Sequence, residues 1–509
     1  MNSGRPESFI ETTKLVIVGA GIAGLGAALT LEKCNFKDYI LIEAQSEIGG
    51  RICSVPWNDG WIERGAQFLH GRGSTLGKFA EEKGFLSDDE VAEGEGLYLR
   101  EDGTEMDHEL VREVDDIVKN IMEDCEKYAT NNEIEYLDVE ENIGKVLKTR
   151  FCKYLTMTND PLSIRNAKEE LFDWNVRFLA IDNACNSLNE LSVKSWGKFK
   201  AVSGPEHNIF KTHYGSMVES IAGKLTQENI RLNSPVKKIE WNEQVNSHDS
   251  KTILVTLQDN KQILANCIIV TCSLGVLKET HNKLFSPILP VRLRGAIESM
   301  GFGMINKVFL DFDEPWWEPG TKGFQFLWRT ETDNCTNNQN KNKLPLWTRD
   351  LTGFDVLPGH RSVLLGWIGR KGARIIESLS EQQIIRDCSD LFKYFLKKNE
   401  VPEARKCLRS RWSSNEFIRG GYSHITKKCD VIGVSPATLA EPIWGTVSSH
   451  QKDERLPILM LAGEATHENY YSTTHGAYDT GVKQAQTFLQ YHVTKYNTQV
   501  FLSVVNLEY

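Results

Sequence analysis

The chain has 509 residues, enough for two large or three ordinary domains. Its 40% hydrophobic and 25% charged residues, with 15 Pro and 39 Gly, are typical of a globular protein with an ample core. They exclude a disordered chain, a collagen and a small disulfide scaffold. The net charge of -10 argues against nucleic acid as a partner, because phosphates need a basic face, and it is compatible with a cationic partner.

Neither a membrane span nor a secretory signal is expected. No window reaches the roughly 18–20 consecutive apolar residues of a transmembrane helix, and residues 1–14 lack a basic region followed by an apolar one. The 11 cysteines are scattered, odd in number and without a CxxC pair. Reduced thiols in a reducing compartment are therefore expected, and no metal site is predicted.

Three segments that are far apart in the sequence have the pattern of one α/β domain. Residues 14–44 read as a strand, a glycine turn, a helix and a second strand. Residues 233–278 contain short β-branched runs typical of strands. Residues 458–492 combine an apolar strand, a polar turn and an amphipathic helix.

The stretches between these segments predict a second domain. Residues 98–215 are charged and have apolar positions at helical spacing. Residues 301–444 contain the strand-like runs KVFLDF, GFQFLW and SVLLGWIG, and a polar loop RTETDNCTNNQNKNK. The economical interpretation is a chain that leaves one domain, builds another and returns twice.

The first segment carries a dinucleotide-binding fingerprint. After the strand LVIVG, Gly19 permits a tight turn, Gly21 lets the backbone approach a pyrophosphate, and Gly24 lets helix and strand pack closely. The helix N-terminus then favours the negative charge. Glu43, at the end of the second strand, is placed to accept hydrogen bonds from a ribose diol.

The next residues indicate a flavin rather than a nicotinamide nucleotide. Gly49, Gly50 and Arg51 follow the ribose carboxylate directly, in SEIGGRI. This pair of glycines with an arginine resembles the signature of the flavin amine oxidases, in which it helps to hold the FAD diphosphate. A surface turn with an exposed arginine is the plainer alternative.

Further blocks resemble the polyamine oxidase branch of that family, which comprises spermine oxidases and acetylpolyamine oxidases. They are WIERGAQFLHG (61–71), GFGMINKVFLDFDEPWW (301–317) and LAGEATHENYYSTTHGAYDTG (461–481). The resemblance implies an FAD-binding domain of Rossmann-like α/β fold with an interleaved α+β substrate-binding domain of mixed sheet and helices. Its expected segments are 12–97, 216–300 and 445–495 for FAD, and 98–215 and 301–444 for the substrate.

The resemblance also implies cofactor contacts in the later segments. Glu464 is expected at the ribityl–phosphate region, and the backbone of Val236 at the adenine. The turn through Thr473, Thr474 and His475 is expected against the flavin ring, with Thr474 on the cofactor and Thr473 on the substrate.

Lys307 and His70 are the catalytic candidates. Lys307 lies in an apolar strand, where an ammonium is costly to bury without partners. By resemblance it holds a water against flavin N5; the alternative is a surface lysine at the end of the strand. His70 is expected to accept a hydrogen bond from a substrate amine and keep it neutral, although a lone histidine is often a packing residue.

Two further residues are candidates for substrate binding. Tyr422 follows Gly420 and Gly421 at a position where monoamine oxidases have the cysteine that attaches FAD. The resemblance therefore implies non-covalent FAD, with the Tyr422 ring facing the flavin and expected to line a slot for the alkyl chain and its cationic ends. An aromatic residue of the core is the alternative. Asp182 stands where the family usually has a glutamate that anchors the polycation; a solvated helix charge is the alternative.

The resemblance implies oxidation of a secondary amine of spermine or of N1-acetylated polyamines by O2, which gives an aldehyde, a shorter amine and H2O2. The alternatives are a monoamine oxidase, a lysine demethylase acting on chromatin, and a flavin-binding module without turnover. The sequence leaves the preferred polyamine and the oligomeric state open.

Localisation is expected to be cytoplasmic, with some nuclear material allowed. The chain ends in Leu507, Glu508 and Tyr509, and a glutamate in the middle of that tripeptide contradicts a peroxisomal address of the SKL type.

Overall fold

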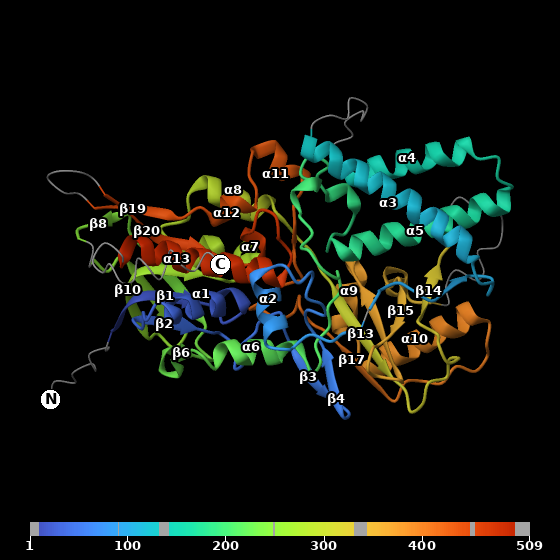
Figure 1. Cartoon of the computed structure of the whole chain (residues 1–509), viewed down its shortest axis with the longest axis horizontal. Coiled ribbons are helices and arrows are strands. Elements are labelled where there is room, and N and C mark those ends of the chain that lie inside the picture. The colour runs from blue at the N-terminus through green and yellow to red at the C-terminus, as the bar shows by residue number, and fades with distance from the viewer. Residues whose placement is uncertain are drawn as a thin grey trace.

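The computed structural model describes residues 10–89, 91–131, 142–247, 250–329, 344–447 and 454–493. It has two lobes that lie side by side along the long axis of the molecule (Figure 1). The predicted polar loop lies outside the described residues apart from Arg329, and so does the C-terminal tripeptide.

The first lobe is built on a mixed sheet that contains ten strands among the described residues. Its centre is parallel, in the order β6-β2-β1-β10-β20. The sheet continues by antiparallel pairing of β9 with β10, β7 with β9 and β19 with β20, and the short strands β11 and β8 pair in parallel with β7 and β19. The strands are β1 (Glu11–Val18), β2 (Tyr39–Ile42), β6 (Ile230–Arg231), β7 (Val236–Trp241), β8 (Gln244–Val245), β9 (Ile253–Leu257), β10 (Gln262–Val270), β11 (Phe285–Ser286), β19 (Ile443–Val447) and β20 (Glu454–Leu461).

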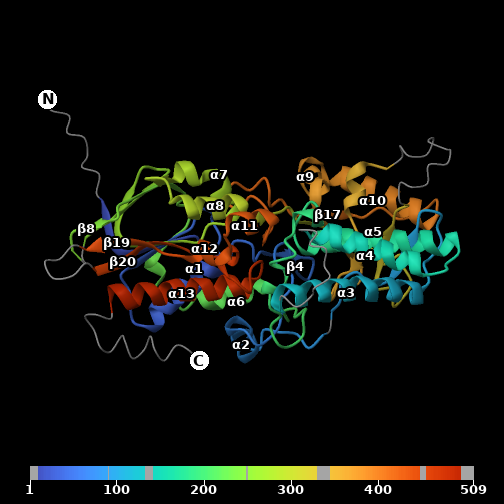
Figure 2. The ribbon, with the colours of Figure 1, turned by 90° about the horizontal axis from the view of Figure 1, so that it is seen from above.

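Helices cover this sheet on both sides (Figures 1 and 2). They are α1 (Ile22–Lys33), α2 (Thr75–Glu82), α6 (Tyr214–Ala222), α7 (Leu274–Leu284), α8 (Val291–Ser299), α11 (Lys427–Ile432), α12 (Pro436–Ala440) and α13 (Thr474–His492). Short 3-10 turns are η1 (Leu188–Glu190), η2 (Trp196–Lys198), η3 (Gln227–Asn229), η4 (Leu346–Asp350) and η5 (Glu464–Thr466).

The second lobe has a sheet of six described strands in the order β17-β13-β16-β15-β14-β5. Two short ribbons, β3 with β4 and β12 with β18, lie outside both large sheets. The bounds are β5 (Leu97–Arg100), β13 (Asn306–Asp311), β14 (Gly323–Leu327), β15 (Gly353–Val356), β16 (Val363–Ile368), β17 (Lys406–Arg409), β3 (Ser54–Trp57), β4 (Gly60–Glu63), β12 (Gly301–Phe302) and β18 (Ser423–His424).

Two sets of helices complete the second lobe (Figure 2). The helices α9 (Arg370–Ser378) and α10 (Glu381–Leu396) share a core with Val308 and Leu310 of β13. The helices α3 (His108–Asn131), α4 (Ile143–Met157) and α5 (Leu162–Asp182) form a separate core. Because side chains alternate along a strand, Lys307 and Phe309 point to the face of β13 opposite Val308.

The predicted α/β fold class is confirmed. The 14–44 pattern forms β1, α1 and β2, and β1 pairs with β2 and β10 in parallel. The apolar run near residue 458 forms β20, followed by α13. The boundaries between the five predicted segments stay a prediction.

The first and last helices, α1 and α13, are in close contact because both have glycines where they meet. A Cβ on Gly481 would stand 1.9 Å from the carbonyl oxygen of Ala23, and one on Gly26 would stand 2.9 Å from the Tyr478 ring. The backbones therefore approach more closely than a methyl group allows. This contact joins segments that are more than 400 residues apart.

Replacing Gly481 with Ala should lower the free energy of unfolding by roughly 1–3 kcal/mol, because the methyl group overpacks a backbone contact that cannot yield. Thermal unfolding of the holoprotein measures the effect. Gly295→Ala in α8 is the matched control, since its Cβ would meet only the Ile432 side chain at 3.3 Å. Equal melting temperatures for the two variants would contradict the close approach.

Candidate active site

A large cavity, with a volume of about 1000 Å³, is lined by residues of both lobes. With one exception, Gly24, every residue predicted for the site lines it. These residues are Gly19, Gly21, Glu43, Gly50, Arg51, His70, Asp182, Val236, Lys307, Tyr422, Glu464, Thr473 and Thr474.

The glycine turn after β1 forms one end of the cavity. Gly19 has a φ of +102°, and a Cβ there would stand 2.5 Å from Thr271 Oγ1. Gly24 lies behind the turn, where a Cβ would stand 1.9 Å from the Gly19 carbonyl oxygen. Gly24 therefore serves the packing of helix against strand, which is the role that the sequence predicted for it.

The start of α1 is suited to an anion. Its N-cap residue is Gly21, which has no side chain to occupy the first N–H groups of the helix. Uncapped N–H groups and the helix dipole attract phosphate. Gly49 and Gly50 approach this turn with φ values of +104° and +60°, and Gly21 and Gly49 form an isolated bridge. These glycines leave room for a diphosphate close to the backbone.

Glu43 follows β2 and is 6% exposed. Its carboxylate accepts hydrogen bonds from the N–H groups of Ala20 at 2.7 Å and Gln45 at 2.9 Å. These bonds fix the carboxylate at the cavity wall, and each oxygen retains a lone pair that a ribose hydroxyl can use. Val236 lines the same cavity at the start of β7.

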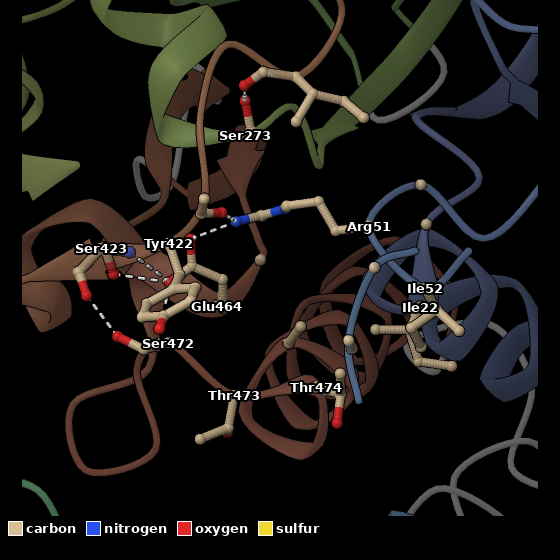
Figure 3. Close-up of a pocket in the computed structure, with 18 of the residues that line it drawn as sticks. Ile22, Arg51, Ile52, Ser273, Tyr422, Ser423, Glu464, Ser472, Thr473 and Thr474 are labelled. Carbon is tan, nitrogen blue, oxygen red and sulfur yellow. Dashed lines mark hydrogen bonds and ion pairs between the residues drawn. The ribbon is translucent and has the colours of Figure 1, made fainter. Parts of the chain in front are cut away.

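Arg51 and Glu464 join the first segment of the chain to the last (Figure 3). The guanidinium donates to Glu464 Oε1 at 2.9 Å and to the carbonyl of Gly421 at 2.7 Å. The other carboxylate oxygen accepts from Ser423 Oγ at 2.6 Å and from the N–H of Ser472 at 3.0 Å. Glu464 is 4% exposed, and this set of donors makes a buried carboxylate tolerable.

Helix α13 begins at the cavity. Its N-cap residue, Thr473, accepts from the N–H of Gly476 at 3.0 Å and donates to the carbonyl of Tyr470. The Thr474 hydroxyl lies 2.5 Å from the Tyr214 hydroxyl. Both threonine side chains are therefore fixed in place.

Lys307 is buried, with 2% exposure, so a surface lysine at the end of the strand is excluded. Its Nζ donates to the Glu63 carbonyl at 2.8 Å and to Gln67 Oε1 at 2.7 Å, and it lies 4.5 Å from the centre of the Trp367 ring. Trp367 is its cross-strand partner in β16. An ammonium has three N–H donors, so one remains for a water or substrate.

Burial lowers the pKa of Lys307 to about 7, although the nearby Glu63 and Glu93 act to raise it. The amine therefore changes charge close to neutral pH. Such a perturbed group at a cavity wall is a candidate for proton handling.

His70 lines the cavity beside Glu206 and His207. Its Nδ1 lies 3.1 Å from the Glu206 carbonyl oxygen, which can only accept, so Nδ1 carries the proton. Burial and the neighbouring His207 lower the pKa of His70. The neutral ring thus retains Nε2 as an acceptor.

Tyr422 and Asp182 lie on one side of the cavity. The Tyr422 hydroxyl donates to the Ile181 carbonyl at 3.0 Å, which fixes the ring next to the end of α5. Asp182, the last residue of α5, opens into the cavity and has a weak contact, 3.2 Å, with Asn183 Nδ2. Asp182 is exposed to solvent, as the alternative of a solvated helix charge predicts, and it lines the cavity. Partial loss of solvent at the cavity wall and the nearby Glu206 act to raise its pKa.

The polar and aromatic residues of the wall that the sequence did not indicate include Gln67, Glu93, Glu206 and Trp367. Gln67 lies between Glu63 and His70, and its place in that block was the available signal. Glu93 and Glu206 stand in loops, where an acidic residue reads as solvated.

None of the helices in the described parts of the chain is long and apolar enough to cross a membrane. Within the same residues, no cluster of three or more His, Cys, Asp or Glu side chains could hold a metal ion.

Comparison with known proteins identifies relatives for the whole chain. A family model described as flavin containing amine oxidoreductase matches residues 22–489. The peroxisomal N(1)-acetyl-spermine/spermidine oxidase of Homo sapiens is 28% identical over 94% of both chains. Probable polyamine oxidase 5 of Arabidopsis thaliana is 28% identical over 95% of this chain and 99% of its own.

A solved structure, wild-type putrescine oxidase bound to putrescine, has the same fold. It matches 95% of this chain and 100% of its own with a TM-score of 0.69, at 16% identity. The cavity also fits FAD, the group that the family requires. The uncapped N-terminus of α1, the glycines of the two turns and the Glu43 carboxylate all line it. Since the family match covers most of the sequence, the protein belongs to the flavin-containing amine oxidoreductases, enzymes whose cofactor is FAD.

Proposed function

We propose that the protein is a polyamine oxidase that acts on a secondary amine of spermine or of N1-acetylated polyamines. The products are an aldehyde, a shorter amine and H2O2. The observation that carries the proposal is the cavity itself. Lys307 and His70 line it together with the carboxylates of Asp182 and Glu206. A cationic substrate requires carboxylates, and the similarity to acetylpolyamine and polyamine oxidases supports this class.

FAD is proposed to bind non-covalently, along the glycine turn, Glu43, Val236, Arg51 and Glu464. When bound, it accepts a hydride equivalent from the carbon beside the amine and passes two electrons to O2. Tyr422 stands where monoamine oxidases have their attaching cysteine, which disfavours that alternative.

The residues of the chain supply binding and proton handling. Neutral His70, with Nε2 free, acts as a general base that takes a proton from the substrate ammonium and leaves the unprotonated amine, which the oxidation requires. The third N–H of Lys307 orients the water that hydrolyses the imine product. Tyr422 and Trp367 supply aromatic surface for the alkyl chain and its charged ends.

A peroxide-coupled screen of the purified yellow protein against spermine, spermidine and their N1-acetyl forms tests the proposal. Oxidation of at least one polyamine, with benzylamine inactive, is expected. Activity on benzylamine alone would indicate a monoamine oxidase, and absence of peroxide with every amine would indicate a binding module.

Cytoplasmic localisation, with a nuclear fraction allowed, stays a prediction, and the human relative is named peroxisomal.

Glu43→Ala should weaken FAD binding about tenfold or more, because the ribose loses a charge-assisted acceptor. Flavin occupancy after dialysis measures this, with Glu47→Ala, an exposed acid in the following loop, as the control. Full flavin occupancy of the Glu43 variant would show that this carboxylate does not bind the ribose.

Acid precipitation of the wild type should release all yellow colour, because the FAD is not covalently attached. Flavin retained in the pellet would show that it is.

Lys307→Met should retain the fold and FAD, since Met matches the length of Lys and suits an apolar strand. Turnover should fall by at least about tenfold, which corresponds to ~1.4 kcal/mol of barrier. Stopped-flow reduction and reoxidation, measured separately, locate the affected step. If both rates equal those of the wild type, Lys307 has only a structural role.

A further inference from the structure

Glu93 has a carboxyl group in the cavity wall, and it takes no part in the proposed reaction. It lies in the loop between α2 and β5 and lines the cavity. Its Oε1 is buried and has no hydrogen-bond partner among the described residues. Leaving such an oxygen without a donor is unfavourable, so a ligand that supplies one gains affinity from it.

The loop that carries Glu93 is fixed by hydrogen bonds. The N–H of Gly94 donates to the Asp355 carboxylate at 3.2 Å, and Gln325 Nε2 donates to the carbonyl of Glu95 at 3.1 Å and to Asp355 at 2.9 Å. Residues from β14 and β15 therefore determine where the Glu93 backbone lies.

Close packing fixes the same loop. Gly94 has a φ of +72°, and a Cβ there would stand 2.9 Å from the Trp174 ring. Gly96 has a φ of +116°, and a Cβ there would stand 2.2 Å from the Gly323 carbonyl oxygen. Because the left-handed backbone and the lack of space both require glycine, Glu93 is held at the wall rather than on a free surface loop.

The charges around Glu93 are mostly negative. Burial raises its pKa to about 8; Asp355 and Asp182 act in the same direction, whereas Lys307 and the nearby Trp367 side chain act against them. Trp367 Nε1 makes no hydrogen bond among the described residues either. A cation next to Glu93 favours its ionised form, since the carboxylate is then paired.

Three carboxyl groups of the cavity wall influence one another electrostatically. The charge of Asp182 acts to raise the pKa of Glu93, and the charge of Glu206 acts to raise the pKa of Asp182. Glu93 also interacts with Lys307, whereas Glu206 accompanies His70. Since all three carboxyls line the same cavity, a chain with several ammonium groups can meet more than one of them.

We propose that Glu93 determines specificity by binding a terminal ammonium of the substrate, so that the site prefers polyamines with free ends to those with acetylated ends. This inference rests on the proposed polyamine oxidase function. An acetamide at that end carries no charge and leaves the Glu93 carboxyl without an ion-pair partner.

The test compares Glu93→Gln with Glu95→Gln. Gln keeps the volume of Glu and removes its charge. Glu95 belongs to the same loop but is exposed and pairs with Lys322 at the surface, so its variant should behave like the wild type. Melting temperatures of the FAD-loaded variants verify that both are folded.

Affinity is measured with holoenzyme reduced beforehand by dithionite, so that no turnover occurs. Calorimetric titration of spermine should show a Kd raised about tenfold or more in Glu93→Gln, and titration of N1,N12-diacetylspermine a change within about twofold. The kcat/KM for spermine should fall in the same proportion as its affinity.

Equal losses for the two ligands would mean that Glu93 shapes the cavity without reading charge, and no loss for spermine would mean that it does not contact the substrate; either result overturns the proposal. If the wild type oxidises no amine, the proposed function fails. The titrations with reduced protein then still decide whether Glu93 binds an ammonium.

Discussion

The ion pair between Arg51 and Glu464 connects parts of the chain that no local interaction could bring together. Glu464 is buried, and its oxygens are satisfied only when Arg51, Ser423 and Ser472 are all in place. Removing one donor from a buried, paired carboxylate costs several times more than an exposed ion pair contributes. The Gly49–Arg51 turn, the β18 ribbon and the segment just before α13 are therefore held together at the cavity wall (Figure 3).

Where the sequence is locally periodic, it predicts the structure well. The run from residue 14 to 44 combines an apolar strand, small residues and a second strand, and each property acts over a few residues, so the β1–α1–β2 unit follows directly. The cavity face of β13 is also set by a local rule, the alternation of side chains. Whether Lys307 on that face is buried depends instead on Glu63, Gln67 and Trp367, which come from other elements.

The position of Glu93 shows why the rest could not be predicted. Its surroundings in the sequence, DDEVAEGEG, are acidic and glycine-rich, a pattern typical of a solvated loop. Burial arises from partners more than 200 residues away: Gln325 and Asp355 hold the loop, and Gly323 leaves no space for a side chain at Gly96. Such contacts depend on tertiary packing, whereas the local composition predicts an exposed loop.

The cavity combines opposite electrostatic requirements. An FAD diphosphate is favoured by the positive end of α1, whereas the polyamine of the proposed function is favoured by carboxylates. Arg51 pairs with Glu464, a carboxylate that other donors also satisfy. Lys307 donates to two uncharged oxygens, the backbone carbonyl of Glu63 and the side-chain carbonyl of Gln67, and not to a carboxylate. Asp182 and Glu93 therefore have no ion pair among the described residues, and Glu93 Oε1 has no hydrogen bond there; the proposed binding of a cationic substrate rests on this arrangement.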